Sequence, residues 1–158
     1  MDWGGWAVFG VVATTLLTAV LMLLQALGRT RLDLPLLLGT ILVADPDRAR
    51  VTGFAIHLAM GQLFAAFYAA GFATLDGAGP WRGALFGLIH AAVALTVLVP
   101  LLPGIHPRMA SERAGPDSTA TIEPPGVLGA NYGLATPIVT VVAHLVYGAV
   151  LGLALHPS

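Results

Sequence analysis

Long apolar segments constrain this chain more than any other feature. The first runs from Ala7 to Leu24 without a charged residue, and three similar segments follow. Each approaches the roughly 20 apolar residues that a helix needs to cross a bilayer. Of the 158 residues, 57% are hydrophobic and 9% are charged, and the mean hydropathy is +0.86. A soluble domain is about one-quarter charged. We therefore expect a single all-α domain, a bundle of four transmembrane helices, with spans at about 6–27, 51–74, 81–100 and 137–155.

Two segments fall outside these spans. Residues 32–42 are apolar but too short to cross, and Pro35 and Gly39 interrupt them, so we expect an interfacial or re-entrant piece against the bundle. Residues 104–136 form the only extended polar stretch, with four of the eleven prolines, and are expected to be a long loop.

Prolines predict where the helices begin and end. A capping residue directly before a proline starts a helix, because proline suits the first helical position. This pattern occurs at Asp45-Pro46, Gly79-Pro80 and Thr136-Pro137. We expect Pro100 and Pro103 to end the third transmembrane helix.

The arginines predict the orientation, because positively charged loops stay in the cytoplasm. The loop between the second and third spans carries only Arg82. The loops after the first and third spans carry Arg29, Arg31, Arg48, Arg50, Arg108 and Arg113. Both termini are therefore predicted outside the cell (inner) membrane, with the 104–136 loop cytoplasmic. The second and fourth helices then run in the same direction, so a duplicated helix pair would be a parallel repeat.

Composition excludes several function classes. With no cysteine, the chain has no disulfide, thiolate nucleophile or cysteine-ligated metal. Net charge is -1 and lysine is absent, which excludes a basic patch for nucleic acid. No Asp or Glu lies in the middle of a predicted span, and we find no nucleotide loop or Ser-His-Asp pattern. The sequence therefore favours a non-catalytic protein.

The motif His-Leu-x-x-Gly occurs twice, at His57 to Gly61 and at His144 to Gly148. Residues four apart share a helix face, so each imidazole lies over a glycine that allows close approach. Two facing imidazoles can ligate haem iron axially or bind a transition-metal ion. Gly61 and Gly148 would then admit the cofactor, and Arg50 or Arg108 would pair with haem propionates.

The alternative to a cofactor site is structural. Two neutral histidines can hydrogen-bond Gln62, Thr140, Tyr147 or backbone carbonyls across the bundle. His90 is expected to be a separate core residue, independent of the histidine pair.

A second group of possible ligands lies in the polar loop. His106 and Glu112 are expected near the cytoplasmic ends of the second and fourth helices. A metal site of His57, His106, His144 and Glu112 would suit Zn, Fe or Mn. The alternative is a polar loop that caps the bundle, with Glu112 paired to Arg108 or Arg113.

Several short motifs together resemble a known family. They are Leu38-Gly39-Thr40, residues 45–53, residues 106–112, Glu123 to Gly126, Asn131-Tyr132-Gly133 and His144 to Gly148. Along nearly its whole length the chain resembles a family of small bacterial four-helix membrane proteins of uncharacterised function. The resemblance implies the membrane class and topology and no activity.

Two function classes are consistent with these observations. The first is a membrane protein whose histidines bind haem or a transition-metal ion. The second is an accessory or structural subunit of a larger membrane complex, or a homo-oligomer, whose small-residue stripes Gly83/Gly87 and Gly148/Gly152 serve contacts between helices. Metal analysis and an absorption spectrum distinguish the two.

Overall fold

The structure is a computed structural model and describes residues 3–75, 77–110, 119 and 121–155. Within these residues every regular element is a helix, and four helical stretches are long and apolar enough to cross a membrane. They are Gly4–Ala26, Pro46–Thr74, Pro80–Ile105 and Thr136–Ala154. The expected all-α bundle with four membrane-spanning helices is confirmed.

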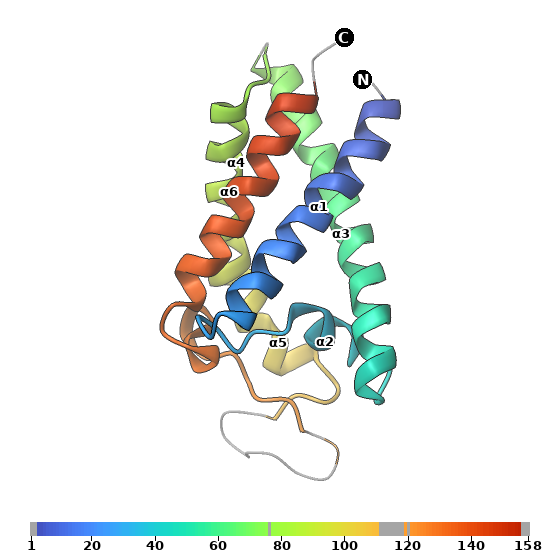
Figure 1. Ribbon diagram of the computed structural model, residues 1–158, viewed down its shortest axis with the longest axis vertical. Coiled ribbons are helices and arrows are strands. Elements are labelled where there is room, and N and C mark those ends of the chain that lie inside the picture. Colours follow the sequence, from blue (N-terminus) through green and yellow to red (C-terminus); the bar gives the residue numbers. More distant parts are fainter. Residues whose placement is uncertain (1–2, 76, 111–118, 120, 156–158) are drawn as a thin grey trace.

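Four long helices form the bundle, and four short elements complete it. The long helices are α1 (Trp3–Ala26), α3 (Pro46–Thr74), α4 (Pro80–Val93) and α6 (Thr136–Ala154). The short elements are α2 (Leu34–Gly39), the π-helix η1 (Ala94–Leu98), α5 (Val99–Ile105) and the 3₁₀-helix η2 (Val127–Tyr132). Figure 1 shows α2 and α5 at one end, here called the loop end, and the start of α1 and the end of α6 at the other, the terminal end.

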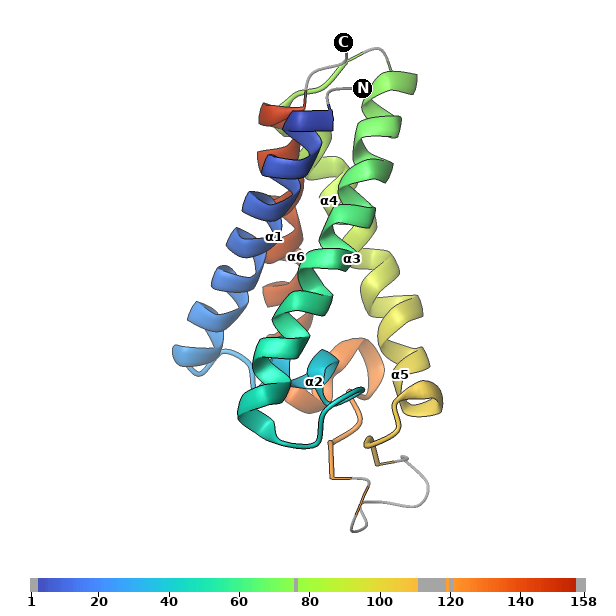
Figure 2. The ribbon, with the colours of Figure 1, turned by 90° about the vertical axis from the view of Figure 1, so that its right-hand side faces the viewer.

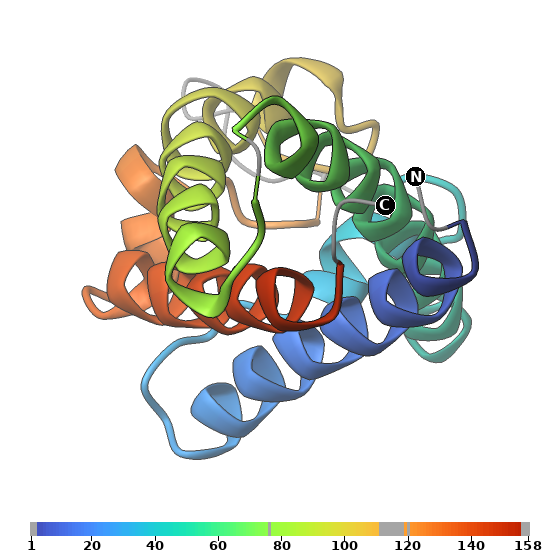
Figure 3. The same cartoon turned by 90° about the horizontal axis from the view of Figure 1, so that it is seen from above.

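The long helices form a ring in which α3 and α4 are the neighbours with the least contact. Viewed along the bundle, their order is α4, α6, α1 and α3 (Figure 3). α4 packs on α6, α6 on α1, and α1 on α3. Between α3 and α4 the contacts are mainly aromatic and lie toward the terminal end, where the Phe72 and Phe86 rings stack with centroids 5.2 Å apart. Toward the loop end, α3 and the chain through α5 diverge (Figure 2).

A proline lies in the first turn of α2, α3, α4 and α6, and α2 and α3 also have acidic caps, as the sequence predicts for α3. The Asp45 carboxylate accepts a hydrogen bond from the Arg48 backbone N–H at 2.9 Å, and Pro46 occupies the first turn. α4 likewise begins at Pro80. The prediction of Thr136 as a cap was wrong: Thr136 is the first residue of α6, and its hydroxyl bonds to the Thr30 hydroxyl at 2.7 Å.

The prediction that Pro100 and Pro103 end the third membrane helix was wrong: the helix runs to Ile105, and Pro103 lies inside α5. The helix continues through the π-helical turn η1, after which α5 begins with Pro100 in its first turn. A proline in a first turn needs no backbone N–H, so the chain stays helical without an unsatisfied donor.

Glycines bring the helix backbones into direct contact. A Cβ added to Gly83 would collide with the Gly148 carbonyl oxygen, and one added to Gly152 would collide with that of Gly79. The interfacial helix α2 also contacts α3 through a glycine, because a Cβ on Gly53 would collide with the Pro35 carbonyl oxygen. As expected, α2 therefore lies directly against the bundle.

Candidate functional site

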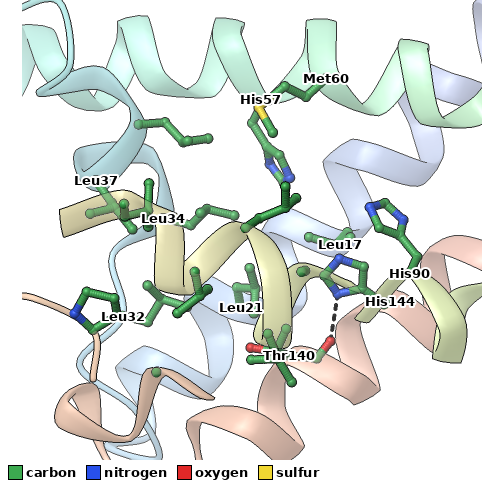
Figure 4. A pocket seen from close by; sticks show the side chains of 18 of the residues that line it. Leu17, Leu21, Leu32, Leu34, Leu37, His57, Met60, His90, Thr140 and His144 are labelled. Atoms are coloured by element: carbon green, nitrogen blue, oxygen red, sulfur yellow. Dashed lines mark hydrogen bonds between the residues drawn. The ribbon is translucent and has the colours of Figure 1, made fainter. Parts of the chain in front are cut away.

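A cavity of about 310 Å³ lies inside the bundle and extends toward the loop end. Most of its wall is aliphatic, from α1, α2, α3, η1 and α5. His57 from α3, His90 from α4 and His144 from α6 also line it. Figure 4 shows these three imidazoles reaching into the same region from three helices. The two histidines of the repeated motif therefore share one cavity.

The Thr18 hydroxyl orients the imidazole of His57. Its Oγ lies 2.9 Å from His57 Nδ1 and also donates to the Thr14 carbonyl oxygen at 2.8 Å. A hydroxyl has one proton, so when Thr18 gives it to the Thr14 carbonyl oxygen, His57 Nδ1 is the donor to Thr18 Oγ. A buried imidazole in an apolar bundle is neutral unless it is paired with a charge. Nε2 of His57 is then the unprotonated nitrogen, with a free lone pair.

A backbone carbonyl orients His144 in the same way. His144 Nδ1 lies 2.8 Å from the Thr140 carbonyl oxygen, one helical turn earlier, and can only donate to it. Its Nε2 is likewise unprotonated. Within the described residues, no hydrogen-bond partner is found for Nε2 of His57 or of His144.

His90 belongs to this cluster, contrary to the expectation that it would be a separate core residue. Its ring lies edge-on to that of His144 with centroids 4.6 Å apart, and it stacks on Phe64 at 3.9 Å. The sequence could have predicted that His90 lies close to His144, because the distance of each from the start of its helix gives its depth in the membrane. His90 lies ten residues beyond Pro80 and His144 seven beyond Pro137. At 1.5 Å per residue from opposite faces of a core about 30 Å thick, the two come within about 5 Å of the same depth.

The Thr140 hydroxyl is the unpartnered polar group of the cavity. It is buried, and no described residue offers it a hydrogen bond. The neighbouring hydroxyl of Tyr147 differs, because it donates to the Gly61 carbonyl oxygen at 2.6 Å. The cavity therefore holds Nε2 of His57, Nε2 of His144 and the Thr140 hydroxyl without a partner among the described residues, beside His90, whose Nδ1 lies 3.4 Å from the Tyr68 hydroxyl. The expected hydrogen bonds from the histidines to Gln62 and Tyr147 are not formed, whereas the one to a backbone carbonyl is.

Of the four predicted metal ligands, His57 and His144 line the cavity and His106 does not. His106 Nε2 lies 2.9 Å from the Leu37 carbonyl oxygen, and its Nδ1 accepts from the Arg108 backbone N–H at 3.1 Å. Both its nitrogens are thus in use within the chain. Glu112 lies outside the described residues. Among the residues that are described, no group of three or more His, Asp or Glu side chains is arranged to hold a metal ion.

The two motif glycines mainly serve helix packing. A Cβ on Gly61 would collide with the Thr14 side chain, and one on Gly148 would collide with the Gly83 carbonyl oxygen. Gly61 lines the cavity, whereas Gly148 faces α4.

The two arginines proposed for the propionates lie at the loop end. The Arg50 Nε–H donates to the Asp33 carboxylate at 2.9 Å. Arg108 donates to the Thr40 carbonyl oxygen. Neither arginine lines the cavity, and no charged side chain is found among the described residues that do. The electrostatic character of the cavity thus comes from neutral dipoles alone.

Comparisons with protein-family models, with curated proteins and with solved structures found no match for this chain.

Proposed function

We propose that this protein is a non-catalytic binding protein of the membrane, and that Nε2 of His57 and Nε2 of His144 hold its ligand. One observation carries the proposal. Each imidazole is fixed by a hydrogen bond from its Nδ1, to Thr18 in one case and to the Thr140 carbonyl in the other, and both line one cavity. Two fixed lone pairs in an apolar enclosure are suited to recognising a ligand, because orientation is set before binding.

Haem or a transition-metal ion remains a candidate ligand on chemical grounds. Histidines that bind metals usually donate their other ring N–H to a carbonyl or a similar acceptor, as both of these do. Imidazole nitrogen suits Zn, Cu, Fe and Ni. Two features argue the other way. The described residues supply no third ligand group, and the cavity lies at the lower end of the roughly 300–1,000 Å³ range of small-molecule pockets.

The accessory-subunit alternative receives no support from the glycine stripes that suggested it. Gly83 and Gly148 contact each other within the chain, as do Gly152 and the backbone at Gly79. A stripe already covered by a neighbouring helix offers no surface to a partner.

The test is an absorption spectrum with metal analysis and mass spectrometry of the purified protein and of its His57→Ala, His144→Ala and doubly substituted variants. We expect a copurifying ligand to be lost almost completely in either single variant, with little further loss in the double variant. A site that needs both groups fails once one is removed. Leu58→Ala and Leu145→Ala are matched controls, because each lies beside a histidine and neither lines the cavity. Retention that is independent of both histidines would overturn the proposal.

A further inference from the structure

We propose that the cavity binds a neutral, lipid-soluble molecule that carries a hydroxyl group, such as a phenol, a quinol or a long-chain alcohol, and that this molecule enters from the bilayer. This inference names the ligand class of the site and so rests on the proposed function. It is carried by the position of the cavity, the composition of its wall and the hydrogen-bonding groups at its polar region.

The composition of the wall selects a neutral, mainly apolar ligand. The described lining residues are leucines and other aliphatic or aromatic side chains, with the three histidines and a few hydroxyls, and none of them is charged. An ionised ligand would lose its hydration there without gaining a counter-charge. An apolar body gains by burial against this wall without that cost.

The polar groups select a hydroxyl. Nε2 of His144 can only accept, because Nδ1 donates to a carbonyl, so a ligand that bonds to it must donate. Nε2 of His57 also accepts when Nδ1 donates to the Thr18 hydroxyl. The unpartnered Thr140 hydroxyl can in turn donate to the ligand oxygen. A ligand O–H thus donates to a cavity-lining imidazole nitrogen and accepts from the buried Thr140 hydroxyl, which otherwise has no partner among the described residues. The Phe64 and Tyr147 rings beside them offer faces and edges to an aromatic head group.

The path from the bilayer lies between α3 and α5. Toward the terminal end the seam between α3 and α4 is closed by aromatic contacts, including Tyr68 against Phe86 at 5.6 Å. The lining toward the loop end includes Met60 of α3, Leu98 of η1 and Leu101 of α5, and these two leucines are 36% and 52% exposed. The π-helical turn η1 forms part of this wall, and such turns often occur at functional sites.

The first experiment measures binding of para-heptylphenol and of its methyl ether to the full-length protein in detergent, by intrinsic fluorescence or calorimetry. We expect the phenol to bind and the ether, which cannot donate, to bind about tenfold more weakly. Decanol is a second probe that separates an aromatic source from an aliphatic one, and binding of either hydroxylated probe at this site supports the proposal. Equal affinity for the phenol and its ether would overturn it.

The Thr140→Val variant tests the binding group without disturbing the fold. The Thr140 hydroxyl has no partner among the described residues, so the valine should leave thermal stability unchanged or slightly raised. Phenol binding should weaken about fivefold. Thr96→Val in η1 is the control, because it makes the same change at an exposed threonine that does not line the cavity. Unaltered phenol binding in Thr140→Val would contradict the placement of the hydroxyl head group.

A blocking substitution tests the path from the bilayer. Leu98→Trp should slow or abolish phenol binding, whereas Val97→Trp, 48% exposed and outside the cavity wall, should not. Equal effects of the two would overturn the proposed entry. Haem or metal bound through His57 and His144, with no phenol binding, would overturn this inference and leave the proposed function standing. If the His57 and His144 variants keep both the copurifying ligand and phenol binding, the proposed function and this inference are both overturned.

Discussion

The hydroxyl of Thr18 determines which nitrogen of His57 is free. The hydroxyl of a threonine in a helix commonly donates a hydrogen bond to the carbonyl oxygen one turn earlier, and that of Thr18 does so to the Thr14 carbonyl oxygen at 2.8 Å. Only its lone pairs then remain for His57. His144 reaches the same protonation pattern with a different acceptor, the Thr140 carbonyl. Two unrelated partners thus produce the same chemical group, an imidazole with its Nε2 lone pair free.

This assignment predicts the tautomers directly. In protein labelled with ¹⁵N at histidine, we expect the Nδ1–H, neutral tautomer for both His57 and His144 at neutral pH. Thr18→Val removes the acceptor of His57 and should mix its tautomers, while His144 keeps its own. The measurement is a two-bond ¹H–¹⁵N correlation spectrum. A protonated Nε2 on either residue in the unsubstituted protein would contradict the assignment.

His106 has a structural role that can be separated from ligand binding. Its two nitrogens connect α2 to the chain after α5, through the Leu37 carbonyl at 2.9 Å and the Arg108 N–H at 3.1 Å. His106→Ala leaves both of these groups without a partner, so we expect a loss of about 1–2 kcal/mol in the free energy of unfolding. Thermal unfolding in detergent measures this, with Leu134→Ala, at a position 92% exposed, as control.

Ligand retention should be unchanged in His106→Ala. A bound metal that disappears in this variant would instead favour the four-ligand site of His57, His106, His144 and Glu112.

At the scale of elements, the contact between α4 and α6 depends on glycine. Without a hydrophobic force between helices in lipid, association relies on close packing, which small residues permit. Gly83 and Gly87 face the Gly148 and His144 carbonyl oxygens, with no space for a Cβ. This contact also positions His144 beside His90, so the packing of two helices builds part of the cavity.

Gly83→Ala should therefore separate α4 from α6. We expect a loss of about 1–3 kcal/mol in the free energy of unfolding, because the methyl group meets backbone rather than a flexible side chain. Gly104→Ala in α5 is the matched control: outside its own stretch of helix, no atom of the described residues lies within 4 Å of the added Cβ, so it should be neutral or slightly stabilising. The measurement is the unfolding midpoint of each variant in the same detergent. Equal midpoints would contradict the close packing of α4 on α6.

The sequence predicts the helices better than it predicts the site. Apolar length and proline position follow from the bilayer and from backbone chemistry, so the four spans and the starts at Pro46 and Pro80 were predicted. The passage through Pro100 was not, because a π-helical turn depends on how the helix packs rather than on its own residues. His57 and His144 were found by their repeated motif. Thr18 was missed as a partner, and His90 as a neighbour, because each contact involves a different helix.

At the scale of the whole molecule, the bundle has the appearance of two similar helix pairs. α1 precedes α3, α4 precedes α6, and in each pair the second helix carries His-Leu-x-x-Gly. The motif glycines contact equivalent positions: Gly61 meets Thr14 of α1, and Gly148 meets Gly83 of α4. Four residues further along these first helices, Thr18 meets His57 and Gly87 meets the His144 backbone. This correspondence supports a parallel duplication, and it accounts for two similarly placed histidines in one cavity.

The orientation in the membrane is a prediction for the whole molecule. Arg31 pairs with Glu123 at 2.8 Å and Arg50 with Asp33 at 2.9 Å, both at the loop end, whereas Arg82 lies beside Gly77 at the terminal end. Basic residues concentrate on the cytoplasmic side, so the loop end should face the cytoplasm and both termini the outside. Because the chain has no cysteine, single cysteines introduced at Ala78 and Ser118 give an unambiguous reading. With an impermeant maleimide on intact cells, we expect label at position 78, and at position 118 only after the membrane is opened. Label at 118 with 78 protected would reverse the orientation and would place the proposed site nearer the outer face than the cytoplasmic one.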